Sequence, residues 1–140
     1  MNTEEKKSLI RRYYKEVWSE GDLAFVDAHM TKDYVNIDPA TPGTRLEGRE
    51  AFKQLVGALR GAFQEMTMTV DGQYAEGDVV VTEWTSRAVH RGSLNGLPPT
   101  GRAGSTTGIT VSRFAGDKIC QDHAIWDLFG LLQRLGAIPS

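Results

Sequence analysis

The segment Cys120–Asp127 reads Cys-Gln-Asp-His-Ala-Ile-Trp-Asp, which places several ionisable side chains and a tryptophan close together. An apolar run, Leu-Phe-Gly-Leu-Leu, follows at once in Leu128–Leu132. Ionisable groups beside buried apolar surface have shifted proton affinities, and such groups serve as acids and bases near neutral pH. If the protein performs chemistry, we therefore expect a large part of it in this segment.

Strand alternation separates the candidates in this segment, because successive side chains point to opposite faces of a strand. Asp122 is the sharpest candidate: inside a cavity its carboxyl would have a raised pKa and would act as a general base or acid. The alternative is an exposed or ion-paired strand residue near the turn at Asp117. Asp127 stands where the strand passes into a helix, and we expect it to be the N-cap of that helix. One face collects Cys120, Asp122, Ala124 and Trp126, and the other collects Gln121, His123, Ile125 and Asp127.

Two other predicted strands also carry a face on which small polar side chains alternate with aromatic ones. This mixture is typical of a small-molecule pocket and differs from the aliphatic composition of a packed core. The histidines have a second interpretation as hydrogen-bonded strand residues, and the aromatic residues have a second interpretation as core. An Asx turn explains Asp38. The candidate polar contacts are Asn36, His90, Thr110 and His123, and the candidate walls are Tyr14, Trp84 and Trp126.

The order of elements along the chain predicts an α+β domain, because helical periodicity comes first and strand alternation follows. Thr3 is the expected cap of the first helix, and a Gly-Pro-rich stretch after Ile37 and another at 92–101 predict loops. The expected helices are one with an apolar stripe from Leu9 to Trp18, a short one through Met30, one from about Arg49 with a core face reaching Phe63, and Leu128–Leu135. The expected strands are Asp33–Asp38, Met66–Val70, Val79–His90, Ser105–Phe114 and Cys120–Asp127.

Composition predicts a small protein, and we expect one domain over residues 1–140. The net charge is −2, from 16 basic and 18 acidic residues, and no basic block indicates a nucleic-acid partner. The polar N-terminus is no signal peptide, no apolar run reaches the ~20 residues of a membrane span, and the single cysteine, Cys120, fits a cytoplasmic location. Three scattered histidines and one cysteine show no metal-ligand spacing, and the phosphate-loop and Gly-x-Ser-x-Gly motifs are absent from the sequence.

The chain resembles a known family along nearly its whole length. The resemblance rests on the segments 10–22, 33–36, 48–52, 92–101 and 126–136, with Gly-Leu-Pro-Pro-Thr-Gly at 96–101 and Leu-Leu-Gln-Arg-Leu-Gly at 131–136 as its more specific motifs. The family is that of the SnoaL-like polyketide cyclases (ester cyclases), in the superfamily of nuclear transport factor two. The resemblance implies a cone-shaped α+β barrel, with three N-terminal helices on a curved, mostly antiparallel sheet that encloses a pocket, and a short C-terminal helix.

The resemblance also implies an intramolecular aldol reaction without a cofactor, in which a carboxylate removes a proton beside a carbonyl group. The position of that carboxylate in the family falls on Ala124 here, a pocket histidine falls on Thr110, and a pocket asparagine matches Asn36. Asp122 shares the strand face of Ala124 and lies about 6.6–6.8 Å from it along the strand. We therefore hypothesise that Asp122 is a relocated base, with Thr110 and Asn36 beside it.

Our first prediction is a cofactor-independent, cyclase-type enzyme that acts on a small, apolar, oxygenated, polyketide-like molecule. The alternatives are a dehydratase, isomerase, hydrolase or hydroxylation-type activity on the same fold, or a non-catalytic module for ligand binding or dimerisation. We expect a homodimer or a higher homo-oligomer, because Thr107, Ile109 and Val111 place apolar groups on the sheet face that points away from the pocket.

Overall fold

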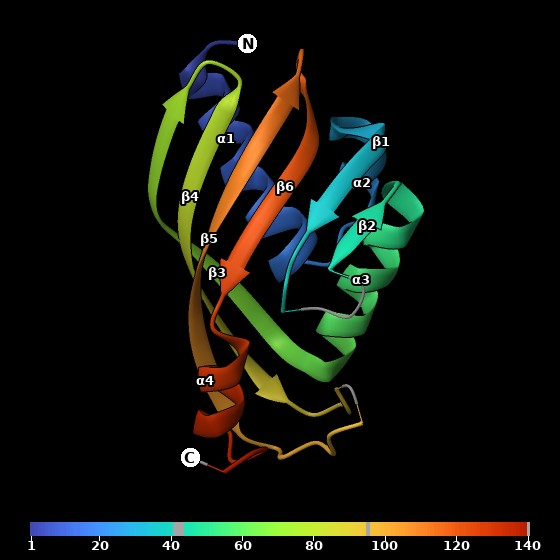
Figure 1. The fold of residues 1–140 in the computed structure, drawn as a ribbon, viewed down its shortest axis with the longest axis vertical. Coiled ribbons are helices and arrows are strands. Elements are labelled where there is room, and N and C mark those ends of the chain that lie inside the picture. The colour runs from blue at the N-terminus through green and yellow to red at the C-terminus, as the bar shows by residue number, and fades with distance from the viewer. Residues whose placement is uncertain (41–43, 95, 140) are drawn as a thin grey trace.

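The computed structural model describes residues 1–40, 44–94 and 96–139 of the chain, and in this part the predicted α+β architecture is confirmed. Four α-helices pack on a curved sheet of six strands that does not close (Figure 1). The helices are α1 (Thr3–Tyr13), α2 (Ala24–His29), α3 (Arg49–Ala62) and α4 (Leu128–Arg134), and a π-helical segment, η1 (Tyr14–Ser19), continues α1. None of the described helices is long and apolar enough to span a membrane.

The sheet has the strand order β2-β1-β6-β5-β4-β3. Every neighbouring pair is antiparallel except β1 and β6, which are parallel. This places the segment that the sequence analysis singled out, now β6, between β1 and β5. The strands are β1 (Met30–Ile37), β2 (Arg45–Glu47), β3 (Phe63–Glu76), β4 (Val79–His90), β5 (Ala103–Ala115) and β6 (Lys118–Trp126).

Several element boundaries differ from the prediction. The cap of α1 is Asn2 rather than Thr3: the Asn2 side chain accepts a hydrogen bond from the Glu5 N–H at 2.8 Å, and the Glu5 side chain accepts from the Asn2 N–H at 3.1 Å. Phe63 begins β3 instead of ending the third helix. Strand β2 was not predicted, because three residues are too few to show an alternation. Of the two predicted loops, residues 41–43 and 95 lie outside the described residues.

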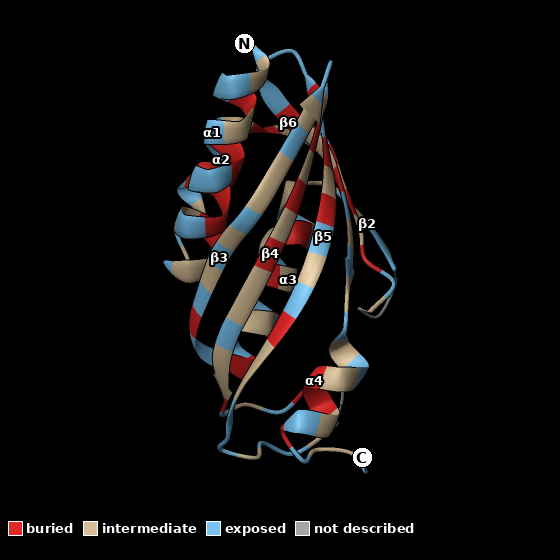
Figure 2. Ribbon diagram, turned by 90° about the vertical axis from the view of Figure 1, so that its left-hand side faces the viewer, coloured by how far each residue is buried: buried red, intermediate tan, exposed pale blue. Residues whose placement is uncertain are grey.

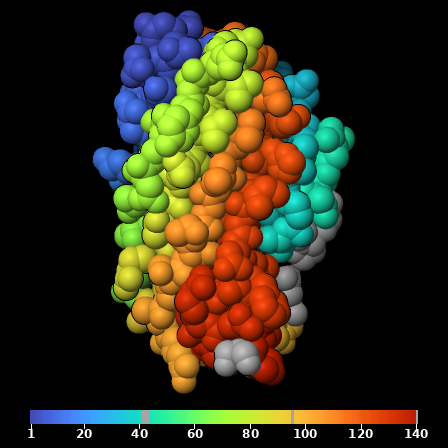
Figure 3. All heavy atoms as spheres, turned by 60° about the vertical axis from the view of Figure 1, so that its left-hand side comes forward, coloured from blue at the N-terminus to red at the C-terminus, as the bar shows by residue number. Residues whose placement is uncertain are grey.

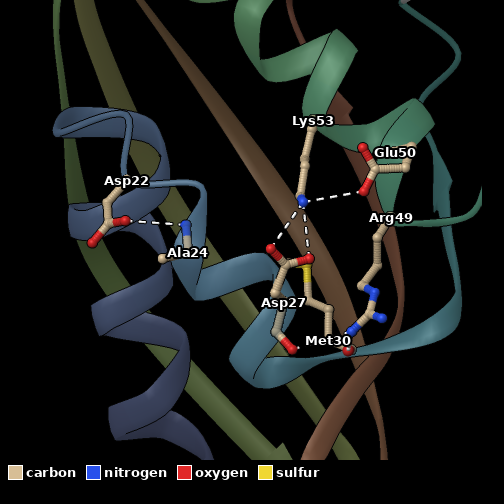
Figure 4. A network of polar contacts seen from close by, with 7 residues as sticks. All are labelled: Asp22, Ala24, Asp27, Met30, Arg49, Glu50 and Lys53. Carbon is tan, nitrogen blue, oxygen red and sulfur yellow. Dashed lines mark hydrogen bonds and ion pairs between the residues drawn. The ribbon is translucent and has the colours of Figure 1, made fainter.

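Helix α3 is held against α2 and the start of β1 by a cluster of charged side chains (Figure 4). The Lys53 ammonium group lies 2.8 Å from the Asp27 carboxylate and 3.1 Å from Glu50. The Arg49 guanidinium donates to the backbone oxygens of Asp27 and Met30, at 3.1 and 3.3 Å. These contacts position the helix whose other side faces the pocket.

The two faces of the sheet differ in burial (Figure 2). Along β5, Thr106, Thr110 and Ser112 are buried, whereas Thr107 and Arg113 on the opposite face are exposed. Ile109 and Ile125 on the outer face are 48% and 56% exposed. Figure 3 shows β3 to β6 side by side on the surface of the molecule.

Candidate active site

A single pocket collects most of the residues that the sequence analysis proposed. It encloses about 770 Å³ of space between the sheet and the helices, including its opening to solvent. Asn36, Thr110 and Asp122 line it, and so do the three aromatic candidates Tyr14, Trp84 and Trp126. The remaining lining residues are Tyr13, Trp18, Asp38, Leu55, Leu59, Phe63, Met66, Met68, Ser86, Ala88, Gly104, Thr106, Ala124 and Leu131.

Asp122 stands between two polar neighbours on adjacent strands. The register pairs it with Ser112 on the antiparallel strand β5 and with Asn36 on the parallel strand β1. The Ser112 hydroxyl donates to Asp122 Oδ1 at 2.5 Å, and the Tyr34 hydroxyl donates to Oδ2 at 2.6 Å. The Asn36 amide in turn donates to the Tyr34 hydroxyl at 3.1 Å. Because three strands share this network, the carboxylate is held in one orientation.

The environment of Asp122 changes its proton affinity. The side chain is 1% exposed, and burial raises the pKa of Asp122 to about 6, against the opposing effect of the hydrogen bonds from Ser112 and Tyr34. Burial disfavours the charged form, whereas donated hydrogen bonds favour it. The exposed or ion-paired alternative for Asp122 is therefore wrong. A carboxyl with this pKa is mostly ionised at neutral pH and is a stronger base than an exposed aspartate.

The π-helical segment η1 brings Tyr14 and Trp18 into the pocket. Its wider hydrogen bonding, with Glu20 N–H donating to the Lys15 oxygen at 2.9 Å, changes which side chains face the sheet. The Trp18 indole donates to the hydroxyl of Tyr13, five residues earlier, at 2.8 Å. The buried Tyr14 hydroxyl lies near Thr110 but makes no hydrogen bond within the described part of the chain. Burial, with the nearby Asp122, raises the pKa of Tyr14 far above its usual value, so the phenol keeps its proton.

Trp84 and Thr110 form one wall together. The Trp84 indole donates to the Thr110 hydroxyl at 2.9 Å. Trp84 is the cross-strand partner of Gly108, and a Cβ atom on Gly108 would overlap the indole ring. Gly108 thus allows the indole to lie flat over β5.

Asp38 is the second carboxylate of the pocket, and sequence reasoning missed it. The predicted Asx turn is present, since the Ala40 N–H donates to Asp38 Oδ1 at 2.9 Å. The side chain is also 6% exposed, lines the pocket, and accepts a hydrogen bond from the Trp126 indole at 2.8 Å. Burial raises the pKa of Asp38. Asp38 is therefore both a turn residue and a pocket residue.

The two histidine candidates lie outside the pocket. His123 is exposed on the opposite face of β6, because it alternates with Asp122, so its predicted contact with a ligand in this pocket is wrong. His90 is fully buried but lines no part of the pocket. Its Nδ1 accepts a hydrogen bond from the Thr100 N–H at 3.3 Å, and its ring packs 5.4 Å from that of Phe63. His90 thus anchors the return of the loop after β4, which corresponds to its second interpretation.

Strand alternation in the sequence also indicates three further polar residues of the site, although the sequence analysis did not propose them as pocket residues. Ser112 shares the strand face of Thr110, and Tyr34 and Asp38 share the face of Asn36 by the same alternation. The predicted N-cap is confirmed: the Asp127 carboxylate accepts from the Gly130 N–H at 2.8 Å. Within the described residues, no three His, Cys, Asp or Glu side chains gather as a metal site would require.

Comparison with known proteins identifies the family. Residues 8–135 match the model of the SnoaL-like polyketide cyclases. The chain belongs to this family. It is 36% identical over 114 residues to nogalonic acid methyl ester cyclase of Streptomyces nogalater, with 79% of this chain and 83% of the relative covered.

Solved structures of other proteins share the fold. A suggested polyketide cyclase from Acidithiobacillus ferrooxidans superposes with a TM-score of 0.86 at 31% identity, covering 97% of this chain and 98% of the other. AclR from Streptomyces galilaeus, a suggested hydroxylase, superposes with a TM-score of 0.84 at 25% identity, covering 99% and 89%. Proteins with different suggested activities therefore share this cone-like scaffold, and the activity of this chain has to be argued from its own pocket.

Proposed function

We propose that the protein is a cofactor-independent cyclase that closes a ring within a polyketide-like methyl ester by an intramolecular aldol reaction. The observation that carries the proposal is Asp122: a fully buried carboxyl with a pKa of about 6 in the wall of a largely apolar pocket. The nogalonic acid methyl ester cyclase similarity suggests the substrate class.

The reaction needs a base, a stabiliser of negative charge and an enclosed space. Ionised Asp122 takes the proton from the carbon beside the ester carbonyl, and the electron pair moves to the carbonyl oxygen as an enolate. The protonated and otherwise unpaired Tyr14 hydroxyl is suited to donate a hydrogen bond to that oxygen. The same carbon then attacks a ketone of the same molecule, and the resulting alkoxide takes the proton back from Asp122. No atom is gained or lost.

The position that the family resemblance assigns to the base is occupied by Ala124, which also lines the pocket. Asp122 reaches the same cavity from two residues earlier on the same strand face. Asn36 supports this assignment indirectly, since it donates to Tyr34, which donates to Asp122. Thr110 supports the wall through Trp84 and lies close to Tyr14.

Turnover of nogalonic acid methyl ester, followed by chromatography and mass spectrometry, tests the proposal. The wild-type protein should give a cyclised product of unchanged mass, and Asp122→Asn should lower kcat by about 10²–10⁴-fold. His123→Asn is the matched control on the other face and should retain wild-type turnover. An Asp122→Asn variant that is folded and turns over at the wild-type rate would refute Asp122 as the base.

A hydroxylation-type reaction is the second candidate, favoured by the similarity to AclR. The same mass measurement separates the two, because a hydroxylated product gains one oxygen atom and a cyclised product gains none. A folded protein that binds the ester and leaves it unchanged would instead indicate a binding module.

Self-association stays a prediction for the outer sheet face. Ile109 and Ile125 expose apolar surface there, and burying it against a second copy would be favourable. Size-exclusion chromatography at micromolar concentration should give the mass of a dimer, and a monomer would contradict the prediction.

A further inference from the structure

The charged side chains in the described part of the pocket wall are all acidic. Among the lining residues that the structure describes there are two aspartates, Asp38 and Asp122, and no lysine, arginine or histidine. Aromatic rings make up much of the remaining wall, and the π-face of such a ring is electronegative and attracts cations rather than anions. A ligand that enters this cavity with a negative charge therefore loses its hydration and meets no compensating positive group in the wall.

The sheet register places Asp38 beside Asp122. Asn36 pairs with Asp122 and Ile37 with His123 on the parallel strands β1 and β6. If this register is continued one residue past the end of β1, Asp38 falls level with Ala124. Asp38 has the same strand parity as Asn36 and lines the same pocket. From the usual strand spacing and rise, the backbones of the two aspartates lie about 8 Å apart.

The hydrogen bonds of Asp38 favour its ionised form. Each carboxylate oxygen accepts from an N–H group, Oδ1 from the Ala40 backbone and Oδ2 from the Trp126 indole. An N–H donor can pair with a carboxylate oxygen but cannot accept a carboxyl proton. Burial raises the pKa of Asp38, and the two hydrogen bonds and His123, on the outer face of the neighbouring strand, oppose that rise.

We infer that Asp38 is a specificity-determining residue, which makes the pocket select uncharged esters over the corresponding free acids. The inference rests on the proposed function for the identity of the pocket. Asp122 repels anions too, but its substitution also removes the proposed base. Asp38 can be changed while Asp122 remains in place.

Binding of a matched pair of ligands tests this role without turnover. The probes are an anthraquinone carboxylic acid and its methyl ester, titrated against tryptophan fluorescence at about pH 7.5, where an aromatic acid is ionised. The wild-type protein should bind the ester at least tenfold more tightly than the acid. For a ligand carboxylate about 8 Å from Asp38, the repulsion at an effective dielectric constant near 20 corresponds to a roughly thirtyfold loss of affinity, so Asp38→Asn should narrow the ratio by ten- to thirtyfold.

Three further variants separate charge from shape and from loss of folding. Asp38→Glu keeps the charge and should keep the ratio. Asp38→Ser removes the charge and keeps a small acceptor, so it should also narrow the ratio of ester to acid affinity. It replaces Asp38→Asn in the test if the asparagine variant fails to fold. Asp33→Asn is the matched control on the same strand, where the side chain is exposed, and should leave the ratio unchanged.

The outcomes also distinguish this inference from the proposed function. Equal wild-type affinities for acid and ester, or a ratio that folded Asp38→Asn and Asp38→Ser leave unchanged, would overturn the inference even if the protein cyclises nogalonic acid methyl ester. If the affinity ratios are as expected but the protein does not cyclise the ester, the inference about Asp38 is supported and the proposed reaction is refuted.

Discussion

The two faces of strand β6 show how neighbouring residues acquire different chemistry. Asp122 points inward, is 1% exposed, and accepts hydrogen bonds from hydroxyls on β1 and β5. His123, the next residue, points outward into solvent. Both side chains are ionisable, yet only the inner one meets the desolvation and fixed donors that turn a carboxyl into a useful base near neutral pH. Whether an ionisable residue of β6 can take part in the chemistry of the pocket therefore depends more on the strand face that it occupies than on its residue type.

After the pair Asp122 and His123, the largest difference between inside and outside should appear at tyrosine. Tyr14→Phe removes the unpaired hydroxyl in the pocket, and loss of one donor to a developing oxyanion should lower kcat by about 10²–10³-fold. Tyr74→Phe is the matched control, because Tyr74 is 61% exposed on β3, and its kcat should stay within twofold of wild type. Steady-state kinetics with the methyl ester measures both. Equal effects of the two variants would contradict the role of the Tyr14 hydroxyl.

The next effect concerns stability and its pH dependence. Folding raises the pKa of Asp122 from 3.8 to about 6, so the folded state binds this proton more tightly than the unfolded state. The stability from this group is then fully present below about pH 4 and is lost as the pH rises through about 6. The loss is about 2–3 kcal/mol, since one pKa unit corresponds to about 1.4 kcal/mol.

Urea unfolding at acidic and neutral pH measures this component. Between about pH 4 and pH 7.5 the unfolding free energy of the wild type should fall by about 2–3 kcal/mol relative to that of Asp122→Asn. The unfolding free energy of Asp33→Asn should change with pH as that of the wild type does, because the side chain at position 33 is exposed to solvent. Parallel curves for wild type and Asp122→Asn would mean that the buried carboxyl carries no raised pKa.

A smaller effect is expected from the donors around Asp122. Ser112→Ala removes a hydrogen bond that lowers the pKa of Asp122, so that pKa should rise by roughly one unit. The acidic limb of kcat/KM should then move to higher pH, with about a fivefold loss of activity at pH 6, where the ionised fraction of Asp122 falls from about one half to about one tenth. Thr107→Ala, on the exposed face of the same strand, should leave the profile in place. A shift of the profile by both variants would point to a general loss of structure.

The smallest effect should come from the outer end of the segment. Asp127→Ala removes the N-cap of α4 and should lower the unfolding free energy by about 1 kcal/mol. The exposed turn residue Asp117 offers the control, and Asp117→Ala should stay within about 0.5 kcal/mol. Thermal or urea unfolding at neutral pH distinguishes the two, and an equal loss in both would contradict the cap.

Much of the fold was predictable because its long strands alternate clearly and its first helix carries a continuous apolar stripe. The same alternation predicted that Asp122 and Thr110 face one side, and the passage from strand to helix predicted that Asp127 is an N-cap. Sequence reasoning fails where one side chain meets both a local and a tertiary requirement, as Asp38 does. The turn at Asp38 is visible in the sequence, but its place in the pocket depends on the parallel pairing of β1 with β6.

Other features could not be inferred because they depend on contacts between distant segments. The hydrogen bond from Tyr34 to Asp122 joins residues 88 positions apart, and the role of His90 depends on how the following loop returns over β4. The π-helical segment that brings Tyr14 into the pocket departs from the 3.6-residue period on which sequence reasoning relies.

The pKa of Asp122 in the folded protein tests the central claim most directly. It can be measured by following the carboxyl carbon resonances of the aspartates by NMR as a function of pH, with the Asp122 signal assigned by its absence in Asp122→Asn. A midpoint of about 6 is expected from the burial of this carboxyl. A midpoint at or below about 4, the value of an exposed aspartate, would contradict the account of Asp122 as the base of this pocket.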